Sequence, residues 1–234
     1  MDGAAVRVLE LFKHDVEMPE HVNLALVIRG DDLSETGQRH TGFVVRDFLG
    51  KYWLFHLGYN NGYRRNPMSQ HYNYLLIPIL EPETETAIMA FLILLLQETK
   101  GEVPYSIAWE ENKDYFNDEG QLVDMSLSDG FTCATFVLEV LKRYGLDLVC
   151  RATWPIPVEG SQDHNWQDEI VNNPNLGLSP DQFTAQVLRI GKHPRFRPEQ
   201  ALGAAHYYRG KRLNHAEVVP AGHEVLAEMA RLRA

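Results

Sequence analysis

The stretch HTGFVVRDFLGKYWLFHL, residues 40–57, contains two runs of β-forming residues separated by a short break. Both runs, residues 40–46 and residues 52–57, are rich in β-branched and aromatic side chains, and Gly50 lies between them. This pattern predicts a β-hairpin. The hairpin carries two histidines, His40 at the start of its first strand and His56 near the end of its second.

The length of the turn determines whether the two histidines share a face of the hairpin. A turn of residues 48–50, with Gly50 in the left-handed conformation, sets His40 one diagonal step from His56 on the same face. A turn centred on Phe48 sets the two histidines directly opposite each other on one face. A turn of residues 47–50 places them on opposite faces. All three registers are compatible with the sequence.

The neighbouring segments extend the hairpin to a small sheet and add a helix. Residues 22–29 predict a strand, and residues 74–80 predict another, with Pro78 favouring an edge position or an irregular end. Residues 84–100 predict a helix that is apolar nearly all round, which is typical of a helix inside the core. Residues 112–130 are polar and indicate a long loop or a weak hairpin.

A second helix begins at Cys133, because apolar residues recur from it at helical spacing until Gly145. Beyond Cys150 the sequence predicts helices without alternating strands. One expected helix starts at a capping box at residues 179–182 and ends at Gly191. Two more are expected at residues 198–208 and 220–233.

These elements predict an α+β fold, in which a small antiparallel sheet packs on the cysteine-bearing helix. The expected organisation is a catalytic domain of residues 1–150 and a mostly helical C-terminal extension or cover of residues 151–234.

The composition restricts the class of protein. The chain has 22 Lys and Arg against 32 Asp and Glu, a formal net charge of −10, which disfavours binding to nucleic acid or to anionic lipid. The longest apolar run, residues 87–96, is about half of the ~20 residues that a membrane-spanning helix needs. Residues 1–7 show no signal-peptide pattern, so we expect a cytoplasmic protein without a membrane span.

The position of Cys133 at the first turn of a helix points to a nucleophile. The positive end of the helix is expected to lower the pKa of this thiol and to favour the reactive thiolate. The alternative is a small buried residue, as most free cysteines are. For Cys150, in a short apolar run, core packing is the preferred interpretation.

A thiol nucleophile needs a base, and a histidine suits that role near neutral pH. If His40 and His56 share a face, one can act as the base and the other can orient it. The alternative is that one histidine lies on the surface and the other packs in the core of an aromatic-rich strand.

Three segments together resemble the circularly permuted papain-like superfamily, which includes lecithin retinol acyltransferase-like proteins and permuted NlpC-type hydrolases. They are HTGFVV at 40–45, WLFHL at 53–57 and TCATFVLEVLKRYG at 132–145. The resemblance implies that His40 is the base, that His56 orients it and that Cys133 is the nucleophile. Tyr105 is similar to the tyrosine that lines the site in part of this superfamily. The resemblance covers roughly residues 22–148.

The resemblance implies a cysteine-dependent hydrolase, a peptidase or amidase that forms a thioester on a peptide, amide or ester substrate and needs no cofactor or metal. The sequence around Cys133 departs from that of the acyltransferase branch. A lipid acyltransferase or phospholipase is therefore the alternative and not the first choice. A further alternative is a non-catalytic interaction module on a papain-like scaffold. Its partner surface would use Trp166, Tyr207, Tyr208 and Arg209 in the C-terminal portion.

Two other sites are weaker. His164, with neighbouring Asn and Trp, fits the unpermuted papain order, but it follows the cysteine too closely and lies in no strand. A zinc site would combine His40 and His56 with Asp31, Asp32 or Glu35, although no fixed ligand spacing supports it.

Overall fold

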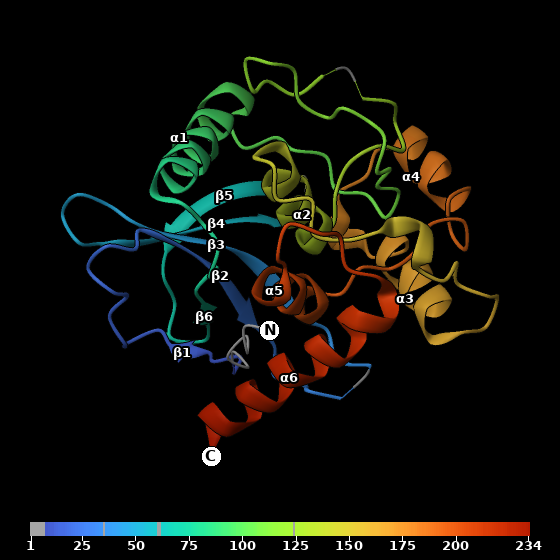
Figure 1. Cartoon of the computed structure of the whole chain (residues 1–234). Coiled ribbons are helices and arrows are strands. Elements are labelled where there is room, and N and C mark those ends of the chain that lie inside the picture. The colour runs from blue at the N-terminus through green and yellow to red at the C-terminus, as the bar shows by residue number, and fades with distance from the viewer. Residues whose placement is uncertain (1–7, 35, 60–61, 124) are drawn as a thin grey trace.

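A computed structural model describes residues 8–34, 36–59, 62–123 and 125–234 as an α+β protein, as expected (Figure 1). The sheet is antiparallel, with strands in the order β1 (Phe12–Lys13), β6 (Asn73–Leu75), β2 (Leu24–Arg29), β3 (His40–Arg46), β4 (Tyr52–Gly58) and β5 (Gly62–Pro67). The α-helices are α1 (Pro82–Thr99), α2 (Cys133–Arg143), α3 (Gln162–Val171), α4 (Pro180–Val187), α5 (Pro198–Tyr207) and α6 (His215–Arg233). Two short 3-10 helices are η1 (Arg151–Thr153) and η2 (Pro174–Leu176).

The hairpin of β3 and β4 has the three-residue turn that was one of the expected registers. Arg46 pairs with Tyr52 across the turn of residues 48–50, and the glycine that ends this turn has a φ of 76°. This left-handed conformation suits glycine, which has no Cβ to clash with the backbone. The register sets His40 one diagonal step from His56 on the same face of the sheet.

The two faces of the sheet bury different clusters. On one face, Phe43 and Phe55 join the main core, and α2 packs there against β3 and β4 while α5 packs against β2. On the other face, Val44 and Leu54 join a smaller cluster with Tyr72. Because side chains alternate along a strand, the two histidines project from the face of the smaller cluster.

Two strands differ from the sequence prediction. Strand β5 was not expected, because its sequence GYRRNP has no apolar alternation and most of its side chains are exposed. Strand β6 ends at Leu75, well before Pro78, so the expected strand over residues 74–80 is too long. It is also an interior strand, paired with β1 and β2, rather than an edge strand.

Helix α1 is half-exposed, not buried all round as its sequence suggests. Ile93 is 41% exposed and Leu94 is 37% exposed, whereas Glu85 is buried and accepts a hydrogen bond from the backbone N–H of Asn23 at 2.7 Å. The buried side of the helix, which carries Ile88, Phe91 and Leu92, packs against the edge strand β5 and against Phe116. No helix in the described part of the chain combines the length and apolar character that crossing a membrane requires.

The C-terminal helices follow the prediction in type but not always in extent. The capping box of Ser179 and Gln182 starts α4 as expected, but α4 ends at Val187 instead of Gly191. Helix α6 begins earlier than expected, because a capping box at Asn214 starts it and Pro220 lies inside the helix. Helix α3 lies in a polar stretch, residues 162–171, and was not among the expected helices.

Residues beyond 150 pack directly on the rest of the molecule. Helix α5 contacts α2 and β2, and α6 packs along α5 (Figure 1). A buried ion pair ties α5 to the loop before β3, with Arg39 donating to the two carboxylate oxygens of Glu199 at 2.7 and 2.8 Å. The division near residue 150 stays a prediction.

Candidate active site

The start of α2 is fixed by hydrogen bonds within its first turn. The hydroxyl of Thr132 accepts from the N–H of Thr135 at 3.2 Å, and the hydroxyl of Thr135 accepts from the N–H of Thr132 at 2.8 Å. This capping box leaves Cys133 as the first helical residue, where the sequence predicts it. The preceding Gly130 has a φ of 147°, and a Cβ there would lie 2.4 Å from the carbonyl oxygen of Pro104. The path of the backbone that leads into Cys133 is therefore closely constrained.

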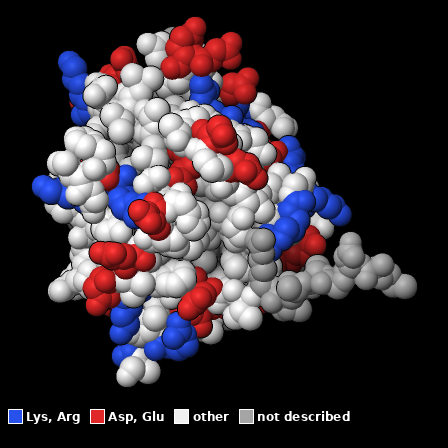
Figure 2. Space-filling view, turned by 60° about the vertical axis from the view of Figure 1, so that its left-hand side comes forward, with Lys and Arg blue, Asp and Glu red and all other residues white. Residues whose placement is uncertain are grey.

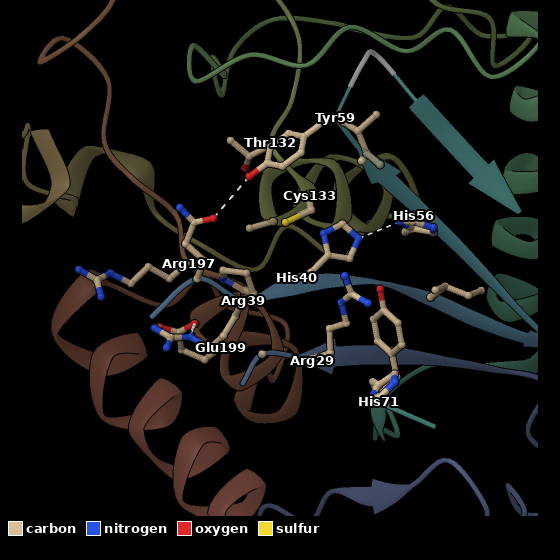
Figure 3. Close-up of a pocket in the computed structure, with 18 of the residues that line it drawn as sticks. Arg29, Arg39, His40, His56, Tyr59, His71, Thr132, Cys133, Arg197 and Glu199 are labelled. Atoms are coloured by element: carbon tan, nitrogen blue, oxygen red, sulfur yellow. Dashed lines mark hydrogen bonds and ion pairs between the residues drawn. The ribbon is translucent and has the colours of Figure 1, made fainter. Parts of the chain in front are cut away.

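The sulfur of Cys133 lies where α2 meets the first residues of β3. The backbone N–H groups of Thr41 and Ala134 both donate hydrogen bonds to it. The side chain points toward the imidazole of His40 (Figure 3). Cys133 is only 8% exposed, and it lines the same cavity as both histidines.

The protonation of this thiol differs from the expectation. Burial raises the pKa of Cys133 to about 11, although the hydrogen bonds from Thr41 and Ala134 oppose that shift. The expected lowering of the pKa is therefore wrong, because removal of the sulfur from water outweighs the field of the helix start. The cysteine is a neutral thiol at pH 7.

The two histidines form a direct pair. Nε2 of His40 lies 2.8 Å from Nδ1 of His56, and the rings are nearly perpendicular at 88°. Because Nε2 of His40 is engaged with His56, Nδ1 is the nitrogen available to the thiol, and it lies on the side of the ring that faces Cys133 (Figure 3). The structure thus brings the three predicted residues together.

Both imidazoles are neutral at pH 7. Burial, with smaller contributions from the charges of His56 and Arg29, lowers the pKa of His40 to about 3. Burial also lowers the pKa of His56 to about 4, against a hydrogen bond to the side chain of Asn66. A neutral imidazole retains the lone pair that a general base needs.

Asn66 is a site residue that the sequence did not reveal. It lies on β5, lines the cavity and is hydrogen-bonded to His56. In the sequence, Asn66 follows His56 by about one short strand. This spacing indicates a contact between the two side chains only when β5 is recognised as the partner of β4.

The cavity has a volume of about 890 Å³ and is built by both halves of the chain. Tyr105 lies in its wall, as expected, with 6% exposure and its ring 5.7 Å from that of Tyr59. Residues beyond 150 supply another wall, including Trp166, Ile170, Asn175, Phe196 and Pro198.

The weaker sequence candidates lie elsewhere. His164 belongs to α3 and does not line the cavity, and Cys150 is half-buried at the start of η1 rather than in the core. Among the described residues, no group of three or more His, Cys, Asp and Glu side chains is arranged to hold a metal ion. Glu35, one of the zinc ligands considered above, lies outside the described residues.

The packing of α5 buries part of the surface that was expected to contact a partner. Tyr208 is only 6% exposed, so the prediction that it contacts a partner is wrong. Tyr207 is hydrogen-bonded to Glu224 on α6, and Trp166 faces the cavity. On the face shown in Figure 2, the described Lys and Arg side chains are interspersed with Asp and Glu.

Comparison of the chain with protein-family models, with curated proteins and with solved structures gives no match.

Proposed function

We propose that the chain is a cysteine-dependent hydrolase, a peptidase or amidase with the catalytic residues Cys133, His40 and His56 on a circularly permuted papain-like fold. The observation that supports it most is a single cavity that holds a thiol at a helix start and a histidine hydrogen-bonded to a second histidine. A cytoplasmic location goes with this proposal.

The roles proposed for His40 and His56 determine which ring nitrogen of each imidazole carries the proton. If Nδ1 of His40 accepts the thiol proton, Nε2 of His40 carries a proton and donates to Nδ1 of His56. The proton of neutral His56 is then on its Nε2, and the side-chain oxygen of Asn66 accepts from this imidazole. His56 and Asn66 therefore orient the base without titrating near neutral pH.

The reaction begins as the sulfur of Cys133 attacks the carbonyl carbon of the substrate while Nδ1 of His40 takes the thiol proton. Proton transfer accompanies formation of the carbon–sulfur bond, because both groups start neutral. The backbone N–H of Cys133, as the first helical residue of α2, would donate to the developing oxyanion.

The tetrahedral intermediate collapses as the carbon–nitrogen bond breaks and the leaving amine takes the proton from His40. Water then attacks the thioester with His40 as the base. The carbon–sulfur bond breaks, the acid is released, and the proton returns to the thiol.

The test uses p-nitrophenyl acetate, whose acetyl group would be transferred to the sulfur. We expect intact-mass and peptide mapping to find the acetyl group on Cys133, with continued release of p-nitrophenol by the parent and by Cys150→Ala. Cys133→Ala should release none above the buffer rate. Acetylation confined to Cys150, or equal turnover by Cys133→Ala, would contradict the proposal.

A second candidate, a non-catalytic interaction module on the same scaffold, is favoured by one observation. Burial of Cys133 raises the pKa of its thiol to about 11, which is the behaviour of an inert core cysteine. This candidate predicts equally slow labelling of both cysteines, and an acetyl-Cys133 intermediate would exclude it.

A further inference from the structure

The cavity carries an excess of positive charge. Five arginines line it among the described residues, against two acidic residues, Asp31 and Glu199. Three of the arginines are held by carboxylates: Arg39 by Glu199, and Arg195 and Arg197 by Asp163. The other two, Arg29 and Arg64, pair with no carboxylate in the described parts of the chain.

The two unpaired arginines flank the histidine pair in one row across four strands. Arg29 is paired with His40 in the register of β2 and β3, and His56 is paired with Arg64 in the register of β4 and β5. The histidines join the two halves of the row through their hydrogen bond. Because paired residues of neighbouring strands share a face, all four side chains project to the same side of the sheet.

Arg29 is exposed to solvent and extends toward the histidine pair. Its guanidinium carbon lies 5.3 Å from the centre of the Tyr72 ring, a cation–π contact that holds the side chain beside His40 (Figure 3). Both side chains line the cavity, and the charges of Arg29 and Arg64 both contribute to the lowered pKa of His56. The chain as a whole has a net charge of −10, so this local positive charge runs against its composition.

We propose that Arg29 and Arg64 bind an anionic group of the substrate, a carboxylate or a phosphate close to the carbonyl that Cys133 attacks. The planar donor fork of arginine matches both anions, and such hydrogen bonds are stronger than neutral ones. This inference rests on the proposed function, because it specifies the substrate class of the same site as an acyl compound with a negative charge.

The test compares alkylation of Cys133 by iodoacetate, which is anionic, with alkylation by iodoacetamide, which is neutral and of similar size. The ratio of the two rates cancels changes in the reactivity of the sulfur itself. We expect the parent to have a higher iodoacetate-to-iodoacetamide ratio than free cysteine. Arg29→Gln and Arg64→Gln should each lower the ratio about tenfold, the loss expected for one charge-assisted contact.

The matched control is Arg65→Gln. Arg65 is the next residue on β5 but projects to the opposite face, where its guanidinium lies 3.9 Å from the Trp53 ring centre. We expect the ratio to be unchanged in this variant. A parent ratio equal to that of free cysteine, or an equal drop in all three variants, would overturn the anion site while leaving the thiol chemistry intact.

Failure of the proposed function gives a different result, because Cys133 would then react with neither reagent. Protection of Cys133 from iodoacetamide by succinate would assign a carboxylate, and protection by inorganic phosphate would assign a phosphate. Protection by neither would contradict the anion site.

Discussion

The hydrogen bond between Nε2 of His40 and Nδ1 of His56, at 2.8 Å, depends on a glycine between them. A Cβ at Gly42 would lie 2.5 Å from the carbonyl oxygen of Phe55 and 2.8 Å from the Cβ of His56. The absence of a side chain at Gly42 therefore lets β3 and β4 approach closely where the two imidazoles meet.

Gly42→Ala is expected to separate the two strands at this point. The clash involves backbone, which cannot rotate away, so we expect a loss of about 1–3 kcal/mol in the free energy of unfolding. Urea denaturation measures this loss, and alkylation of Cys133 reports the effect on the site. The control is Gly58→Ala, at the end of the neighbouring strand β4, where the nearest atom to an added Cβ is 3.7 Å away. Equal stability of the two variants would contradict this role for Gly42.

Asn66 is expected to act as a positioning residue for His56. Asn66→Leu removes the acceptor and should lower kcat for p-nitrophenyl acetate about tenfold, less than the ~10²–10⁴-fold that loss of the general base itself would cost, with little change in KM. Asn66→Asp keeps an acceptor and should restore most of kcat. If both variants lose activity equally, or if KM rises while kcat is unchanged, Asn66 does not act through His56.

The ion pair of Arg39 and Glu199 is expected to contribute strongly to folding. Both side chains are almost fully buried, so Glu199→Gln leaves a guanidinium without its counter-charge, at a cost of about 3–5 kcal/mol. Arg231→Gln breaks an exposed pair with Glu228 and should leave the denaturant midpoint nearly unchanged, because solvent and salt screen exposed pairs. Denaturant midpoints compare the two. Similar small losses would show that α5 is not tied to the site through this pair.

The stability of the protein is expected to fall in acid because of the buried histidines. Burial holds the pKa of His40 at about 3 and that of His56 at about 4, below the usual 6.5. The unfolded chain then binds more protons between pH 6.5 and 3, so stability is full above pH 6.5 and is lost as the pH falls through this window.

Thermal unfolding at a series of pH values tests this dependence. We expect His40→Asn and His56→Asn each to flatten the fall in Tm between pH 6.5 and 4, while His223→Asn, at an exposed position of α6, leaves it unchanged. A parent Tm that is constant over this window would contradict burial of neutral imidazoles.

The parts of the site that were predictable from the sequence are local. The hairpin follows from two β-rich runs around a glycine turn, and the start of α2 follows from apolar spacing after a capping residue. That the hairpin and the start of α2 lie close together was suggested only by the resemblance to the papain-like superfamily. Asn66 was missed because β5 is a polar strand, held by pairing with β4 and not by an apolar pattern of its own.

The protonation of Cys133 was mispredicted for a related reason. The helix start can be read from neighbouring residues, whereas burial of the sulfur depends on the cavity walls. Those walls include residues far away in the chain, such as Trp166 and Glu199. Desolvation is a property of the assembled fold, and it reverses the shift that the helix alone would produce.

The central claim, that Cys133 is a nucleophile served by His40, is tested most directly by peptide mapping after brief iodoacetamide treatment across a range of pH. We predict that Cys133 is modified faster than Cys150 at pH 7, that its reaction persists down to about pH 4 because His40 stays neutral, and that His40→Gln abolishes this advantage. An unreactive Cys133 in the folded parent, or a reaction that is unchanged in His40→Gln, would contradict the claim.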